Sequence, residues 1–267
     1  MTADVDVIIV GAGPVGLWVA SELRLAGVGV TIVEERPGRT VHSRALTIHP
    51  RTVEILASRG QADRVLEEGL AIPSGHFAVL DERLDFSQLD TPFPFTVALL
   101  QARTEEILET HVLDAGAEIR RGVRVVGITE LEESVQVQLD DGTALSASWV
   151  VGCDGVHSTV RQKAGIEFPG DRRTCLGWLG DVELTDPLPG FISRWSLDGL
   201  VYAVPLPGGK LYRFVGIAPD DVRTDWPAED FSLEELSHKV TTVMGTDYGM
   251  HSPVWLSRYG NKARQAW

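Results

Sequence analysis

The sequence predicts an α/β fold in two parts, and three observations support this prediction. An apolar segment at residues 5–10 leads into a glycine-rich turn at residues 11–16, and a helical pattern follows the turn. Strand-like and helix-like segments then alternate, and later strand-like segments recur with one helical pattern among them. We therefore expect a Rossmann-like domain at residues 1–172, with a parallel sheet and an antiparallel meander. A second, mostly antiparallel β-sheet domain should occupy residues 173–267.

The first glycine motif reads G-A-G-P-V-G and begins at Gly11. Gly11 permits a tight turn, Gly13 lets the backbone approach a pyrophosphate, and Gly16 lets the helix pack closely on the strand. Pro14 suits the first turn of a helix, where its missing N–H would have no intrahelical partner. The positive end of the helix dipole favours a diphosphate. The motif predicts a dinucleotide site, and the alternative is a plain βαβ turn without a ligand.

An acidic residue closes the second apolar strand, residues 28–33. This residue, Glu34, can accept hydrogen bonds from an adenosine ribose. Its neighbour Glu35 is a further candidate for cofactor binding. Strand, glycine turn, helix and acid together make dinucleotide binding the preferred interpretation.

The other elements of the first domain follow from periodicity and turn signals. Helices are expected at residues 50–56, 62–68 and 104–115. The alternating segments at residues 124–131, 134–139 and 144–148 should form the antiparallel meander. Residues 149–151 read as a fully buried strand that leads into a second glycine motif.

The second domain should contain strands and one capped helix. The strand-like segments are residues 175–184, 191–197, 200–206, 211–218 and 253–258. The helix should begin after Ser232, with Glu235 completing a capping box, and continue to about Met244.

Composition limits the class of protein. The 267 residues carry a formal charge of −14, which argues against nucleic acid as a partner. Two cysteines, Cys153 and Cys175, give neither a metal-ligand spacing nor a disulfide framework and fit a reducing compartment. No apolar stretch approaches the roughly twenty residues that cross a bilayer, and no signal peptide is recognised. We expect a cytoplasmic protein without a membrane partner.

A second motif at residues 152–161 places two glycines between a strand and a helix. Within it, Asp154 can accept hydrogen bonds from backbone N–H groups or sugar hydroxyls. Arg161, one helical turn further on, can face an anion. Taken alone, the segment is also compatible with an Asp-Gly turn followed by a surface arginine.

Taken with the first motif, this segment resembles the "DG" fingerprint of the single-component flavoprotein aromatic hydroxylases, the para-hydroxybenzoate hydroxylase fold group. The matching residues are Gly152, Asp154, Gly155, Ser158 and Arg161. The resemblance implies that the segment approaches the pyrophosphate of FAD and helps NAD(P)H to dock.

The same resemblance implies roles for residues elsewhere in the first domain. Glu34 corresponds to the acid that binds the FAD ribose. Arg44 and Ala45 lie in a segment similar to the one beside the pyrophosphate and the flavin. Gln101 lies at a strand-to-helix junction where the family has a glutamine that contacts FAD. The alternatives, which we disfavour, are that Arg44 is a surface arginine and that Gln101 is a polar residue at a helix start.

Several short segments resemble the branch that hydroxylates aromatic polyketides in antibiotic biosynthesis, including angucycline and anthracycline tailoring enzymes together with rifampicin monooxygenases. These segments are residues 20–28, 151–155, 205–209 and 259–261. The family's third fingerprint is a Gly-Asp followed by small residues and often a histidine, and it should follow the strand-like segment near Arg264, where the sequence reaches Trp267. We therefore expect an N-terminal part of a hydroxylase, without the C-terminal flavin segment and the C-terminal domain.

The resemblance implies an FAD-dependent monooxygenase. NAD(P)H would reduce the flavin, O₂ would add to give a C4a-hydroperoxide, and its distal oxygen would attack a phenolic or polyketide ring. Baeyer–Villiger oxygenation on the same scaffold and an inactive flavin-binding fragment are the alternatives. Halogenation is disfavoured, because no W-x-W-x-I-P motif occurs.

The sequence identifies no catalytic residue and predicts no metal site. Tyr202, Tyr212, Arg213 and Trp195 lie on expected strands that could line a substrate face, although aromatic residues on sheets are more often core. A homodimer is one candidate for the oligomeric state.

Overall fold

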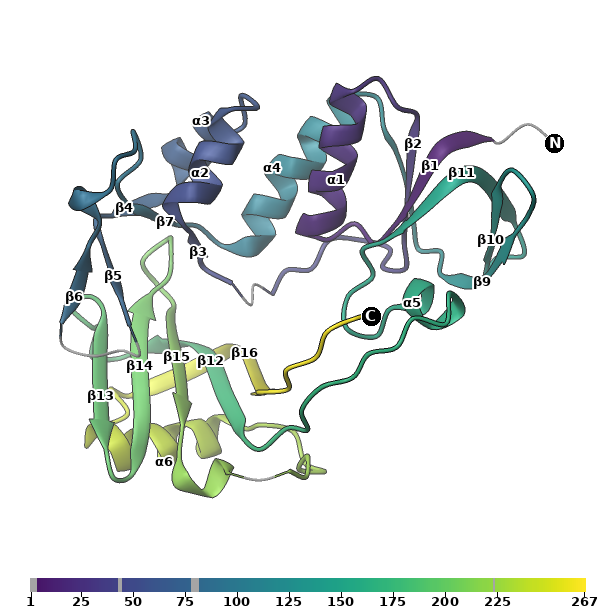
Figure 1. Ribbon diagram of the computed structural model, residues 1–267. Coiled ribbons are helices and arrows are strands. Elements are labelled where there is room, and N and C mark those ends of the chain that lie inside the picture. Colours follow the sequence, from purple (N-terminus) through teal and green to yellow (C-terminus); the bar gives the residue numbers. More distant parts are fainter. Residues whose placement is uncertain (1–3, 43–44, 78–81, 223) are drawn as a thin grey trace. The chain divides into compact units, whose positions relative to one another are not determined.

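The computed structural model describes residues 4–42, 45–77, 82–222 and 224–267 (Figure 1). The chain forms two compact units. The first comprises residues 1–71, 90–168 and 266–267, and the second comprises residues 72–89 and 169–265. Residues 72–89, which precede the expected domain boundary by some eighty positions or more, thus cluster with the second unit.

A six-stranded mixed sheet forms the centre of the first unit (Figure 1). In spatial order its strands are β8 (Glu118–Arg121), β2 (Val30–Glu34), β1 (Val5–Val10), β11 (Ala144–Gly152), β10 (Val135–Leu139) and β9 (Val125–Glu130). Pairing is parallel from β8 to β11 and antiparallel among β11, β10 and β9. The expected combination of a parallel sheet and a meander is confirmed.

The central strand β1 alternates between two cores, as the period of two requires. Val7 and Ile9 belong to the core that contains α1 (Pro14–Leu25) and α4 (Gln101–Asp114). Ile8 and Val10 belong to a core beneath the meander. The two helices lie side by side on one face of the sheet (Figure 1).

The other elements of the first unit are short. They are β3 (Thr47–Ile48), α2 (Pro50–Ala57), α3 (Ala62–Glu68), β4 (Leu70–Ile72), β7 (Thr96–Ala98) and α5 (Thr159–Lys163). Strands β3, β7 and β4 form a small sheet of their own.

Some details differ from the expectations. Residues 149–151 are not a separate buried strand, because β11 runs on without a break and Trp149 is 71% exposed. The pairing of β11 with β10 extends to Ala147, and Trp149 lies beyond it. Helix α4 begins three residues before the expected Thr104, since the Leu100 carbonyl already accepts hydrogen bonds from the amides of Arg103 and Thr104.

The second unit contains a five-stranded antiparallel sheet, as expected. In spatial order its strands are β13 (Ile192–Ser196), β14 (Gly199–Pro205), β15 (Tyr212–Ile217), β12 (Leu176–Leu184) and β16 (Met250–Gly260). Strands β5 (Ser74–His76) and β6 (Arg83–Asp85) form a separate pair. Short 3-10 turns occur at Phe86–Gln88 and Pro219–Asp221.

Helix α6 (Leu233–Met244) covers one face of this sheet. Its start is capped, because Ser232 Oγ accepts a hydrogen bond from the Glu235 amide at 3.1 Å. Its end is set by Gly245, whose φ of 87° is the left-handed conformation that glycine adopts without strain. On the sheet, Trp178 and Phe214 pack in the core that α6 completes.

Candidate functional site

The two glycine motifs lie next to each other. Val10, the last residue of β1, is the register partner of Gly152, the last residue of β11. The Cys153 amide donates to the Val10 carbonyl at 2.8 Å, which continues the pairing into the loops. Both motifs therefore leave the same edge of the parallel sheet, where ligands of such sheets bind.

The three glycines of the first motif serve different purposes. Gly11 has a φ of 104°, and a Cβ there would lie 2.5 Å from the Cys153 carbonyl oxygen. A Cβ on Gly16 would lie 1.9 Å from the Gly11 oxygen, so this glycine is required by packing. A Cβ on Gly13 would meet nothing within 4 Å. Gly13 therefore faces open space, as expected for a residue that lets a pyrophosphate approach.

Helix α1 begins at this open space. Pro14 is its first residue, the N-cap Gly13 has no side chain to offer, and the first turn holds no acidic residue. The partial positive charge of the helix start is therefore not offset from within its first turn. This arrangement suits the diphosphate of a dinucleotide.

Asp154 has one satisfied and one unsatisfied carboxylate oxygen. Oδ2 accepts hydrogen bonds from the amides of Thr159 (2.6 Å) and Val160 (3.1 Å) at the start of α5. Oδ1 is buried and has no hydrogen-bond partner among the described residues. An unpaired buried acceptor is costly, so a ligand hydroxyl placed there would satisfy it. The adjacent Gly155 has a φ of 77° and open space where a Cβ would stand.

Glu34 holds the glycine turn from the end of β2. Its Oε2 accepts from the Ala12 amide at 2.7 Å, and its Oε1 accepts from the Arg36 amide at 3.0 Å. A carboxylate offers about four acceptor positions, so capacity remains for ribose hydroxyls. Glu35, the neighbouring candidate, has an exposed side chain.

Gln101 and Ala45, two further candidates, are joined directly. The backbone N–H of Gln101 donates to the Ala45 carbonyl at 3.2 Å. The backbone N–H of Ala45 donates to the side-chain Oε1 of Gln101, also at 3.2 Å. The side-chain Nε2 of Gln101 donates to Glu105 Oε1 at 2.8 Å, which fixes the orientation of the amide. Arg44 lies outside the described residues.

Arg161 is engaged by its own motif. Its Nη1 donates to the Val156 carbonyl at 3.0 Å, and its guanidinium lies 4.2 Å from the centre of the Phe168 ring. The first of these contacts ties Arg161 to the loop that carries Asp154 and Gly155. Contact of Arg161 with an anion stays a prediction.

Cys153 lies between the two motifs, and its environment disfavours a reactive thiolate. Burial, and secondarily the charge of Asp154, raise the pKa of its thiol. The thiol therefore remains protonated at neutral pH and packs as a small apolar group.

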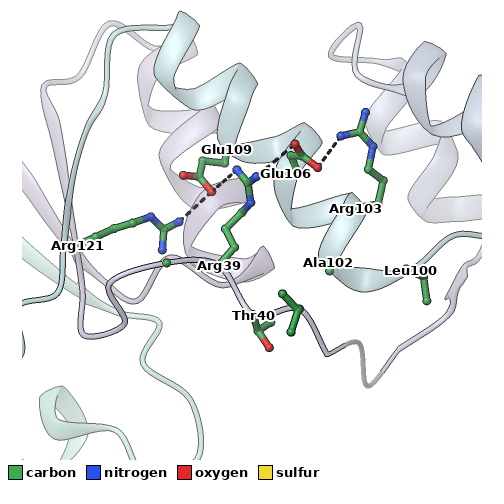
Figure 2. Close-up of a pocket in the computed structure, with 10 residues that line it drawn as sticks. Arg39, Thr40, Leu100, Ala102, Arg103, Glu106, Glu109 and Arg121 are labelled. Carbon is green, nitrogen blue, oxygen red and sulfur yellow. Dashed lines mark hydrogen bonds and ion pairs between the residues drawn. The ribbon is translucent and has the colours of Figure 1, made fainter. Parts of the chain in front are cut away.

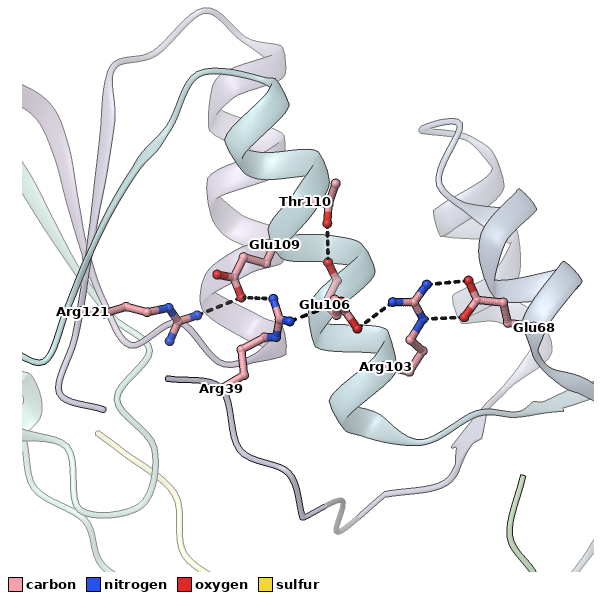
Figure 3. A network of polar contacts seen from close by, with 7 residues as sticks. All are labelled: Arg39, Glu68, Arg103, Glu106, Glu109, Thr110 and Arg121. Atoms are coloured by element: carbon pink, nitrogen blue, oxygen red, sulfur yellow. Dashed lines mark hydrogen bonds and ion pairs between the residues drawn. The ribbon is translucent and has the colours of Figure 1, made fainter. Parts of the chain in front are cut away.

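A set of ion pairs on the outer side of α4 was not anticipated from the sequence. It surrounds a pocket of about 660 Å³, which Figure 2 shows. The charged residues alternate in sign in the order Arg121, Glu109, Arg39, Glu106, Arg103 and Glu68 (Figure 3). The spacing of Arg103, Glu106 and Glu109 on one helix face is the signal that could have revealed it.

The second unit has a sheet face opposite α6, and its register brings charged and aromatic side chains together. Asp181 pairs with Arg213 on one side and with Trp255 on the other. Arg213 forms two hydrogen bonds to Asp181, both 2.7 Å, and is 2% exposed. Tyr202 stacks with Phe191, their ring centres being 6.1 Å apart.

The candidate substrate-face residues divide between the two faces of this sheet. Tyr202 and Arg213 lie on the face opposite α6. Trp195, whose register partner is Leu200, lies on the same face and is 56% exposed. Tyr212 instead belongs to the buried core on the α6 side. Tyr212 is therefore a core residue and does not line a substrate face.

The described residues form neither a metal cluster nor a membrane-spanning helix. No group of three or more His, Cys, Asp or Glu side chains there could hold a metal ion. None of the helices formed by those residues is both long enough and apolar enough to cross a membrane.

Comparison with known proteins places the chain in a family. Residues 4–267 match the family described as "FAD binding domain", and the chain belongs to it. It is 44% identical over 267 residues to the uncharacterized aromatic compound monooxygenase YhjG of Bacillus subtilis, and 40% identical over 269 residues to a rifampicin monooxygenase of Streptomyces venezuelae. The resemblance expected from the two motifs is thereby confirmed.

A solved structure agrees with this assignment. The anhydrotetracycline hydroxylase OxyS of Streptomyces rimosus is 36% identical and superposes with a TM-score of 0.85 over 98% of this chain. Each of the three matches includes 98% of this chain. The same matches include only 53% of YhjG, 55% of the rifampicin monooxygenase and 53% of OxyS. The chain therefore spans about half the length of the proteins it matches.

Proposed function

We propose that this chain binds FAD and forms the flavin and substrate part of a monooxygenase. The enzyme would hydroxylate an aromatic compound, either a phenol or an aromatic polyketide, with NAD(P)H as reductant. The observation that carries the proposal is the site at the edge of the first sheet. There an uncapped helix start, an open Gly13 and the unpaired buried oxygen of Asp154 lie on two adjoining motifs.

The described residues fit FAD in a definite way. The start of α1, with Gly11, Gly13, Pro14 and Gly16, would receive the diphosphate. Glu34, with Glu35 beside it, would accept ribose hydroxyls. Asp154 Oδ1, next to Gly155, would accept a hydroxyl of the sugar or ribityl part. Ala45 and Gln101, together with Arg44 and Arg161, complete the proposed set.

Bound FAD would supply the redox chemistry, taking electrons from NAD(P)H and activating O₂ so that one oxygen atom reaches an electron-rich ring. The chain's own residues would bind and orient the cofactor and the substrate. In the second unit the sheet face opposite α6, with Tyr202 and Trp255, offers aromatic surface for a flat substrate.

The relatives' names support the substrate class, since they refer to an aromatic compound, rifampicin and anhydrotetracycline. Oxygen insertion of the Baeyer–Villiger type would need the same cofactor and a different placement of the substrate, and product analysis separates the two. The free cysteines, Cys153 and Cys175, fit a reducing compartment, so we place the protein in the cytoplasm.

The first test is FAD binding by the chain. The purified protein is desalted, mixed with FAD, desalted again and examined by visible spectroscopy. Flavin bands that co-elute with the protein are the expected result, followed by bleaching with NAD(P)H in the presence of candidate phenols. A folded protein that remains colourless contradicts the proposal for this chain.

Asp154→Asn tests the proposed site, because asparagine keeps an oxygen to cap α5 but removes the charge and one acceptor. We expect the Kd for FAD to rise about tenfold, which corresponds to the loss of one hydrogen bond to a charged group. The matched control is Asp141→Asn, an exposed aspartate that likewise accepts an amide hydrogen bond in its own turn. Equal Kd values for both variants would exclude Asp154 from the site.

A further inference from the structure

The ion pairs along α4 connect this helix to three other parts of the first unit. We call the six residues Arg121, Glu109, Arg39, Glu106, Arg103 and Glu68 the ion-pair chain (Figure 3). Arg121 belongs to β8, Glu109 and Glu106 to α4, and Arg39 to the loop that follows β2. Arg103 and Glu68 extend the chain to α3.

Within the ion-pair chain, Arg39 connects the loop at residues 38–42 to helix α4. Its Nη2 lies 3.2 Å from Glu106 Oε1, and its Nη1 lies 3.4 Å from Glu109 Oε2. Hydrophobic burial does not hold this loop, since Val41 is 82% exposed. In Figure 2 the Arg39 side chain reaches from the loop toward the acidic side chains of α4.

Glu109 is the more buried of the two glutamates that Arg39 contacts. It is 8% exposed, and its Oε2 also accepts from Arg121 Nη2 at 2.8 Å. An ion pair between exposed charges contributes little to stability. A buried carboxylate that loses its cationic partners leaves an unpaired charge, which is strongly destabilising, so the paired conformation is favoured. Glu109 therefore favours the conformation in which Arg39 and Arg121 both face it.

The same helix also holds the chain on the far side of residues 43–44. There Gln101, the first residue of α4, binds Ala45 through its backbone and its side chain. Arg39 lies before the proposed FAD contact Arg44, and Ala45 follows it directly. A loop fixed to one helix on both sides loses less conformational entropy when a ligand binds.

We infer that the contact of Arg39 with Glu109 positions the loop at residues 38–42 for FAD, so that Arg39 is a positioning residue for cofactor binding. This inference rests on the proposed function. Arg39 acts through the placement of the loop and is not itself a contact of the cofactor. All three arginines of the ion-pair chain are engaged by glutamates, so the adjacent pocket presents paired rather than unpaired positive charge.

The test compares Arg39→Gln with Arg59→Gln. Arg59 forms an ion pair of 2.9 Å with Glu22 and has a side-chain exposure of 38%, against 41% for Arg39. Flavin fluorescence titration of the cofactor-free chain should give a Kd for FAD about tenfold higher in the first variant and unchanged in the second. Arg39→Lys should recover part of the affinity, because lysine can pair with one glutamate but not present a fork to two.

A second measurement does not depend on FAD. Thermolysin cleavage of the cofactor-free chain before Val41 should be several-fold faster in Arg39→Gln and in Glu109→Gln than in the wild type. Thermal unfolding of each variant records whether the fold is intact. Because Arg39→Gln changes a partly exposed residue, it keeps the test valid if Glu109→Gln fails to fold.

The outcomes are distinct. A higher Kd for FAD together with faster cleavage in Arg39→Gln supports the inference. An unchanged Kd, or unchanged cleavage, overturns it. A wild-type chain that does not bind FAD contradicts the proposed function before any variant is compared, and the positioning role for FAD is rejected with it.

Discussion

At the scale of single residues, two aspartates differ in whether the fold supplies hydrogen-bond partners to both of their carboxylate oxygens. Both oxygens of Asp181 are hydrogen-bonded to Arg213, and both residues are buried. Asp154 uses one oxygen for α5, and its other oxygen is buried without a partner among the described residues. The first arrangement stabilises the second unit, and the second is what a binding site requires before its ligand arrives.

The pair of Asp181 and Arg213 gives a prediction about stability. Asp181→Asn leaves the guanidinium of Arg213 buried without a compensating charge, which costs about 3–5 kcal/mol. Urea denaturation monitored by tryptophan fluorescence should show this loss. Asp198→Asn, an exposed position between β13 and β14, should change the free energy of unfolding by less than about 0.5 kcal/mol. Similar values for the two variants would mean that the ion pair is not a stabilising contact.

At the scale of elements, the turn between β1 and α1 separates structural from ligand-facing glycines. Gly16→Ala places a methyl group against the Gly11 carbonyl, so α1 must move away from the sheet. Gly13→Ala places it in open space and should reduce the free energy of unfolding by at most about 1 kcal/mol. We expect Gly16→Ala to lose stability and FAD binding together, and Gly13→Ala to lose mainly FAD binding. Circular dichroism melting with FAD titration checks this, and loss of fold in Gly13→Ala would contradict it.

Sequence patterns predicted most elements because local signals specify them. Glycine turns, the Ser232 cap and alternating residues gave the strands and helices to within a few positions. Strand β8 was not anticipated, since its charged sequence has no apolar alternation and its place is set by parallel pairing with β2. The exposure of Trp149 was not anticipated either, because an apolar run such as residues 149–151 does not show which of its side chains the tertiary structure covers.

The candidate site divides in the same way. Residues in the two motifs were identifiable because the motifs have fixed spacing. The contact of Arg39 with Glu109 was not, because the two residues are 70 positions apart in sequence and meet only in the folded chain. Glu34 was expected to bind ribose, and its hold on the Ala12 amide emerged from the geometry of the turn.

At the scale of the whole molecule, the two units have separate hydrophobic cores, and every described residue proposed to bind FAD belongs to the first. FAD should therefore stabilise the first unit selectively. At a concentration of one hundred times its Kd, a ligand adds about 2.7 kcal/mol to the state that binds it. Hydrogen exchange should then show strong extra protection of amides in β1 and α1 and little change in β14 and α6. Equal protection of both sets would show that the units unfold together, and no protection in either would contradict FAD binding at the glycine motifs.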